Sequence, residues 1–126
     1  MTMDIKTVEE LNGLIRGGGI REYIQWEERA KLGQIKDIAE EMAEQSQHLK
    51  WIWLAGPSSA GKTTFTQRLA TALNAQGIPT HQISLDNYFL NRELTPKNAK
   101  GEYDYEHIEA IDLPLLERHL DQLENG

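Results

Sequence analysis

The sequence predicts an α/β fold for residues 51–126, preceded by a helical arm over residues 1–50. Two observations support this prediction. Residues 51–55 form an uninterrupted apolar run, as expected of a strand that is covered on both faces. Residues 56–64 then read Gly-Pro-Ser-Ser-Ala-Gly-Lys-Thr-Thr, and a helical pattern follows over residues 65–76. A strand, a glycine-rich loop and a helix in succession are the context that a phosphate-binding loop requires.

The loop matches the pattern G-x-x-x-x-G-K-[ST] in full, which predicts binding of a nucleotide phosphate tail. The alternative is a glycine-rich turn with an incidental lysine. A phosphate-binding loop in this context indicates a P-loop NTPase core, a Rossmann-like three-layer α/β/α arrangement. Gly56 and Gly61 let the backbone turn tightly and approach the phosphates. The N–H groups from Ser59 to Thr63 are expected to form an anion-binding concavity at a helix N-terminus.

The side chains of the loop have distinct expected roles. Lys62 reaches the β- and γ-phosphates of ATP, and the Thr63 hydroxyl contacts Mg²⁺. Thr64 either donates to the α-phosphate or bonds locally at the helix start. The predicted ATP-binding residues are Gly56, Pro57, Ser58, Ser59, Ala60, Gly61, Lys62, Thr63 and Thr64.

Composition excludes several other classes of protein. The chain has 126 residues and a formal net charge of −7, with 13 basic and 20 acidic residues. This balance argues against a nucleic-acid or anionic-membrane surface, but not against ATP. There is no cysteine, hence no disulfide framework or cysteine metal site. No apolar stretch approaches the roughly 20 residues of a membrane span, so we expect a cytoplasmic protein.

The length indicates part of a larger enzyme. The roughly 70 residues from the loop to residue 126 are too few for a five-stranded doubly wound sheet, because each βαβ unit takes about 30 residues or more. We therefore expect residues 51–126 to contain an incomplete sheet.

Helical patterns dominate the arm. Residues 7–10 read as a capping box, and residues 17–19, all glycine, are expected to end that first helix. Apolar residues at three- and four-residue spacings then predict helix from residue 20 to residue 42, with Gly33 as an expected break. The arm either packs within the chain or contacts another domain.

The α/β part continues after the loop helix, which Gly77 is expected to cap. A second strand is predicted over residues 80–85, followed by an irregular polar stretch over residues 87–102. A last helix is expected from Asp112, an N-cap residue with Pro114 in the first turn.

Asp86 follows the second predicted strand, at the end where ligands collect in open α/β sheets. A carboxylate there accepts the proton of an attacking hydroxyl or holds Mg²⁺ through water. The alternative is a turn or cap residue. Aromatic and acidic residues gather nearby, over residues 83–89, 92–96 and 103–107, and these types suit a pocket for a ring and a ribose.

Three segments in this order, residues 56–64, 84–89 and 103–112, resemble the uridine kinase branch of the uridine kinase/phosphoribulokinase family. Residues 20–25 are similar to bacterial relatives in which a threonyl-tRNA-synthetase-like portion precedes the kinase domain. The resemblance implies ATP-dependent, Mg²⁺-assisted phosphoryl transfer to a nucleoside 5′-hydroxyl. It also implies that residues 51–126 are the N-terminal part of a P-loop kinase domain, with Lys62 as a catalytic residue.

The resemblance further implies roles for residues of the acceptor side. Asp86 matches the carboxylate that takes the proton from the 5′-hydroxyl. Glu106 falls where uridine kinases carry an aspartate that holds the ribose hydroxyls. Phe89 falls where they carry a tyrosine near the base, and Tyr88 supplies the preceding aromatic ring. Because Glu106 and Phe89 differ from the residues of uridine kinases at these positions, the specificity for base and sugar is open. His107 matches a common position, for which we expect a structural hydrogen bond rather than catalysis.

The family's strand order is 2-3-1-4-5, so the resemblance implies that the strand between the two predicted ones lies beyond Gly126, as does a lid with arginines. Unpaired strand edges seek partners. We therefore expect direct pairing of the two strands, exchange between copies in a homo-oligomer, or loose order around residues 87–111.

Three other functions stay open at this stage. The first is a nucleotide-binding module without turnover, and the second is a related kinase that acts on another alcohol, such as a sugar phosphate or a pantothenate-like acceptor. The third is a switch-type NTPase that hydrolyses ATP or GTP without an acceptor. The aromatic pair at residues 88 and 89 favours a planar ring weakly. The identity of the nucleoside and the choice between ATP and GTP are open as well.

Overall fold

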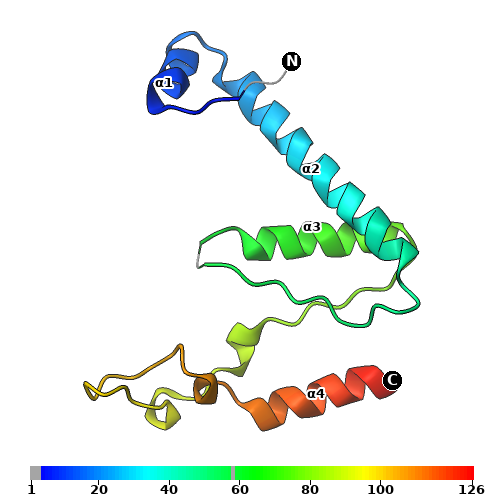
Figure 1. Cartoon of the computed structure of the whole chain (residues 1–126), viewed down its shortest axis with the longest axis vertical. Helices are drawn as coiled ribbons and strands as arrows, with labels where there is room; N and C mark the ends of the chain where they lie inside the picture. The colour runs from blue at the N-terminus through cyan, green and yellow to red at the C-terminus, as the bar shows by residue number, and fades with distance from the viewer. Residues whose placement is uncertain (1–3, 58) are drawn as a thin grey trace. The chain divides into compact units, whose positions relative to one another are not determined.

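The computed structural model describes residues 4–57 and 59–126 (Figure 1). Its α-helices are α1 (Val8–Arg16), α2 (Ile20–Glu44), α3 (Lys62–Ala75) and α4 (Leu113–Asn125). Three short 3-10 turns are η1 (Leu85–Tyr88), η2 (Arg92–Leu94) and η3 (Ile108–Ala110). The chain divides into two compact units, residues 1–82 and residues 83–126. None of the described helices is long and apolar enough to cross a membrane.

The capping box predicted at the start of the arm is confirmed. The Glu10 N–H donates to the Thr7 hydroxyl at 3.2 Å, and the Thr7 N–H donates back to the Glu10 carboxylate at 3.0 Å. The backbone N–H groups of Lys6 and Thr7 bond to that carboxylate and lower the pKa of Glu10 below its ordinary value. Helix α1 ends with Gly17 as its C-cap, as the glycine run predicts.

Helix α2 is continuous from Ile20 to Glu44, so the expected break at Gly33 is wrong. A glycine inside a helix costs about 0.5–1 kcal/mol relative to alanine. The turn after Gly33 buries Ile35, which is 5% exposed, and Ala39, which is fully buried. Burial of one large aliphatic side chain stabilises by about 1.5–3 kcal/mol. Packing therefore outweighs the cost of the glycine.

The first unit is built on the contact between α2 and α3. Ile35 and Ala39 of α2 pack against Leu69 and Leu73 of α3 to form its buried core. Partly buried apolar side chains surround this core: Ile38, Met42, Phe65, Ala72 and Ile78. At the edge of the interface, an Arg68 nitrogen lies 2.9 Å from a Glu28 carboxylate oxygen. The arm and the loop helix thus share one core.

Neither predicted strand forms within the described part of the chain. Residues 51–55 and 80–85 are irregular there, and the β-pairing consists of isolated bridges, Phe89 with Ile111 and Lys97 with Tyr103. A strand is stable only when its backbone groups pair with a neighbouring strand, and the apolar run instead leaves Trp53 69% exposed. The described residues therefore do not show the predicted sheet or the direct pairing of its two strands. Exchange between copies stays a prediction.

The second unit is held by backbone contacts between its first segment and the start of α4. The Leu90 N–H donates to the Ala110 carbonyl at 2.8 Å, and the Asp112 N–H donates to the Tyr88 carbonyl at 2.7 Å. These bonds, with the two bridges and three 3-10 turns, order residues 87–111, so the loose order expected there is not observed. The predicted cap of α4 is confirmed, because Asp112 Oδ1 accepts from the Leu115 N–H at 3.1 Å.

Alanine substitutions at two glycines should change the free energy of unfolding in opposite directions. Gly77 follows α3 in the left-handed region, at φ +80°, whereas Gly33 lies inside α2, and a Cβ would meet open space at both positions. We expect Gly77→Ala to lower the free energy of unfolding by about 1–2 kcal/mol. Gly33→Ala should raise it by about 0.5–1 kcal/mol. Urea unfolding followed by circular dichroism measures both, and shifts of the same sign would contradict the assigned backbone conformations.

The core between α2 and α3 can be tested by shortening one of its buried side chains. Leu73 is 2% exposed, and Leu73→Ala should lower the free energy of unfolding by about 2–5 kcal/mol, because a cavity remains in the core. Leu32→Ala is the control, since Leu32 is 48% exposed on α2 and its truncation should cost about 1 kcal/mol. Equal losses in urea unfolding would show that the core lies elsewhere.

Candidate functional site

The predicted phosphate-binding loop connects residues 51–55 to α3. Among its described residues, the backbone takes the left-handed conformation at Ser59, with φ +63°, and at Gly61, with φ +82°. Such residues turn the chain sharply, and Gly61 does so without the steric cost that a side chain brings. Ser58 lies outside the described residues.

Lys62 folds back over the loop that precedes it. Its Nζ donates to the carbonyl oxygen of Gly56 at 2.7 Å and to that of Pro57 at 2.8 Å. Both acceptors are neutral, whereas a phosphate oxygen carries negative charge, so a bond from the ammonium group to phosphate adds the attraction of opposite charges. An incoming phosphate can therefore compete with the carbonyls for the ammonium group.

The first turn of α3 has no side-chain cap at its N-terminus. Gly61 is the N-cap residue and offers no side-chain acceptor to the first-turn N–H groups. These groups and the positive end of the helix dipole attract an anion. Thr63 and Thr64 lie in this first turn, and both residues are exposed. The described residues of the motif thus place two exposed threonines at a helix N-terminus without a side-chain cap.

Asp86 and the two aromatic residues after it lie on or next to η1 in the second unit, but they differ in exposure. Asp86 is exposed, and Phe89 is 43% exposed. Tyr88 is only 8% exposed, and its hydroxyl lies 2.8 Å from Nδ1 of His119 on α4. Sequence reasoning missed this contact, because it joins residues that lie 31 positions apart.

Glu106 and His107 lie between Tyr105 and η3. Glu106 is exposed, and its N–H donates to Asp104 Oδ1 at 3.1 Å. His107 is the N-cap residue of η3, where its Nδ1 accepts from the Glu109 N–H at 3.2 Å. The structural hydrogen bond expected of His107 is therefore present. In the described part of the chain, acidic and histidine side chains form no cluster that could hold a metal ion by themselves.

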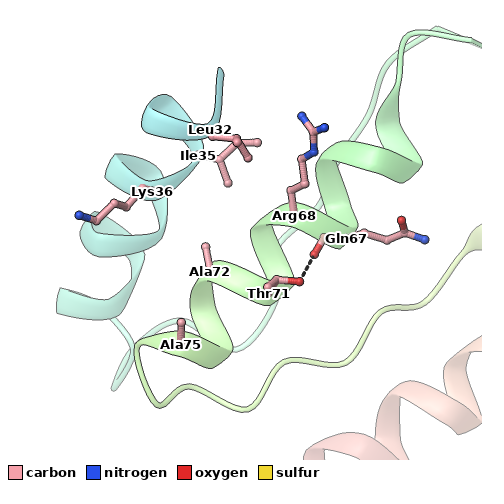
Figure 2. A pocket seen from close by; sticks show the side chains of 8 residues that line it. All are labelled: Leu32, Ile35, Lys36, Gln67, Arg68, Thr71, Ala72 and Ala75. Carbon is pink, nitrogen blue, oxygen red and sulfur yellow. Dashed lines mark hydrogen bonds between the residues drawn. The ribbon is translucent and has the colours of Figure 1, made fainter. Parts of the chain in front are cut away.

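Each unit carries an open hollow. The hollow of the first unit, about 330 Å³, lies between α2 and α3 (Figure 2) and is lined by Leu32, Ile35, Lys36, Gln67, Arg68, Thr71, Ala72 and Ala75. None of these residues belongs to the loop. The hollow of the second unit, about 260 Å³, is lined by Asn87, Tyr88, Phe89, Leu90, Asn91, Leu94, Asp112 and Leu115. The hollow beside η1 therefore includes two residues of the predicted acceptor site.

The predicted residues thus fall into two groups, one in each unit. The loop belongs to residues 1–82, whereas Asp86, Tyr88, Phe89 and Glu106 belong to residues 83–126. Within the second unit, backbone pairing brings residues 88–90 to residues 110–112, which joins two of the three segments that carry the family resemblance.

Comparison with known proteins identifies the family to which this chain belongs. The profile of the Phosphoribulokinase / Uridine kinase family matches residues 51–126, from the first predicted strand to the last residue. No significant match to a solved structure was found.

Several curated relatives are similar to the same part of the chain. A uridine kinase of Deinococcus deserti is 39% identical over 75 residues, which cover 60% of this chain and 35% of the relative. A uridine kinase of Schizosaccharomyces pombe is 36% identical over 80 residues, or 62% and 17% of the two chains. A uridine kinase of Lactobacillus helveticus is 35% identical over 72 residues, or 57% and 34%. The chain thus spans about a third or less of the length of these relatives, and by its family match it belongs to the phosphoribulokinase/uridine kinase family.

Proposed function

We propose that this chain supplies the phosphate site and the acceptor segment of a kinase that transfers the γ-phosphoryl group of ATP to the 5′-hydroxyl of a uridine-like nucleoside. The observation that carries the proposal is the Lys62 loop at the uncapped N-terminus of α3, in a chain of this family. The names of the relatives support the nucleoside as the acceptor.

At the phosphate end, the backbone N–H groups from Ser59 to Thr63 donate to the phosphates of ATP. Lys62 exchanges its carbonyl partners, Gly56 and Pro57, for phosphate oxygens and neutralises charge that develops on the transferring group. Little covalent chemistry is left to the protein, so positioning and electrostatic stabilisation supply most of the rate.

At the acceptor end, Asp86 accepts the proton of the attacking 5′-hydroxyl. Its exposure on η1 supports this role, because a general base must reach the substrate. Glu106 is exposed as well, and its carboxylate suits the vicinal hydroxyls of a ribose. Phe89 is the exposed aromatic residue of the segment, and we assign it to the base.

The donor set of this chain fits Mg²⁺ in the manner usual for phosphate sites. Mg²⁺ prefers hard oxygen ligands and keeps several waters, so it takes one or two protein groups together with substrate phosphates. In this proposal the exposed Thr63 hydroxyl at the start of α3 would hold the ion, and Asp86 would bind it through water. When bound, the ion neutralises phosphate charge.

The phosphate site can be tested by calorimetry with Mg-ATP. Lys62→Ala removes the only ammonium group of the loop and should weaken binding at least about tenfold, as expected for the loss of charged hydrogen bonds. Lys36→Ala is the matched control, since Lys36 is an exposed lysine of α2. Its Nζ lies 3.6 Å from Oε1 of Glu40. The Mg-ATP affinity of the Lys36→Ala variant should stay within about twofold of that of the wild type. Equal affinities in all three proteins would contradict a phosphate site at the loop.

The acceptor can be tested by measuring ADP formation with and without uridine or cytidine. We expect formation that depends on the nucleoside, and Asp86→Asn should lower kcat by roughly 10²–10⁴-fold because the general base is lost. Asp121→Asn, the same change on the exposed surface of α4, is the control and should leave kcat unchanged. Equal ADP formation without nucleoside would identify a hydrolase instead. Binding of ATP without turnover would identify a nucleotide-binding module, and turnover only with other alcohols would identify a different acceptor.

A further inference from the structure

Tyr88 and His119 form a polar contact beneath the proposed acceptor segment. The Tyr88 hydroxyl lies 2.8 Å from His119 Nδ1, and the two rings meet edge to face with centroids 5.6 Å apart and an interplanar angle of 69°. Depending on the histidine tautomer, either the Tyr88 O–H donates to Nδ1, or the Nδ1–H donates to the phenol oxygen. Both arrangements hold the side chains together.

The main chain of Tyr88 is anchored to the same helix. Its carbonyl accepts from the Asp112 N–H at 2.7 Å, at the N-cap of α4, and its side chain reaches His119 seven residues further along. Tyr88 is also the last residue of η1, the 3-10 turn that carries Asp86. One residue therefore connects the proposed general base to two points of α4.

The turn itself is weak without this anchor. A 3-10 turn has poorer hydrogen-bond geometry than an α-helix, and in η1 the Asn87 N–H bonds to the Ser84 carbonyl at 3.1 Å. Leu85 is 40% exposed and adds little burial, whereas Tyr88 is 8% exposed. The orientation of Asp86 then depends mainly on how Tyr88 is held.

We propose that His119 is a positioning residue for the acceptor segment, which it holds through the Tyr88 hydroxyl, so that Tyr88 is an anchor and Phe89 alone faces the nucleoside ring. This inference rests on the proposed function for its acceptor role. Tyr88 is 8% exposed and its ring packs against that of His119, so it offers little ring surface to a base, whereas Phe89 is 43% exposed.

The anchor is tested first by amide hydrogen exchange on the full chain, which needs no turnover. Tyr88→Phe removes only the hydroxyl, and His119→Leu removes its partner. Each should lower the protection of the Leu90 and Asp112 amides about five- to tenfold, the size expected for one hydrogen bond. The double variant should be no worse than either single one, because both remove the same bond. His119→Asn retains a polar group near the Nδ1 position and should restore most of the protection.

The amides of Leu69 and Leu73 in α3 are the internal control and should keep their protection. Unchanged protection of Leu90 and Asp112 in both single variants would overturn the anchor, as would losses that simply add in the double variant.

The acceptor role is tested by calorimetry with nucleoside and with Mg-ATP, at a temperature where every variant is folded. Tyr88→Phe and His119→Leu should weaken nucleoside binding severalfold and equally, with rescue by His119→Asn, while the Mg-ATP affinity stays within about twofold. A purely structural pair would lower the unfolding temperature without this selective loss, and that result would overturn the positioning role. If the wild-type chain binds no nucleoside but both variants still lose protection together, the proposed function fails and the anchor stands.

Discussion

The contact between α2 and α3 is the interaction on which the phosphate-binding loop depends. A helix of 14 residues such as α3 is marginally stable by itself, and most helical stability in proteins comes from packing of an apolar face. Leu69 and Leu73 obtain that packing from Ile35 and Ala39 of the arm. Because the last residues of the loop form the first turn of α3, a stable α3 fixes the position of the Lys62 ammonium group and of the first-turn N–H groups.

The same arrangement explains why a segment outside the family match belongs to this unit. The family profile begins at residue 51, whereas the helix that buries α3 ends at Glu44. The arm therefore covers part of the surface of the loop helix. Family membership implies a P-loop NTPase fold for the matched part, yet residues 51–55 have no ladder in the described structure. Their exposed apolar side chains, Trp53 above all, are those of a strand without its sheet.

The acceptor segment follows a different principle. It has little regular structure of its own, and it is shaped by short-range turns together with a few hydrogen bonds to the start of α4. In such a segment the exposure of each side chain depends on single contacts, so neighbours separate into buried and exposed residues. Asp86 and Phe89 are exposed, whereas Tyr88 between them is buried. This alternation is consistent with the proposal that Tyr88 anchors the turn while Phe89 contacts the ligand.

The sequence by itself determined the features that rest on local chemistry. The Thr7–Glu10 capping box, the Asp112 cap and the glycine-rich loop before α3 follow from which side chains and backbone conformations are available within a few residues. The membership of the family likewise follows from the order of three short motifs. Only the tertiary structure decided that Gly33 does not interrupt α2, that residues 51–55 lack a ladder, and that Tyr88 points to His119. Each of these depends on a partner far away in the chain, or on the lack of one among the described residues, and local propensity contains no information about such partners.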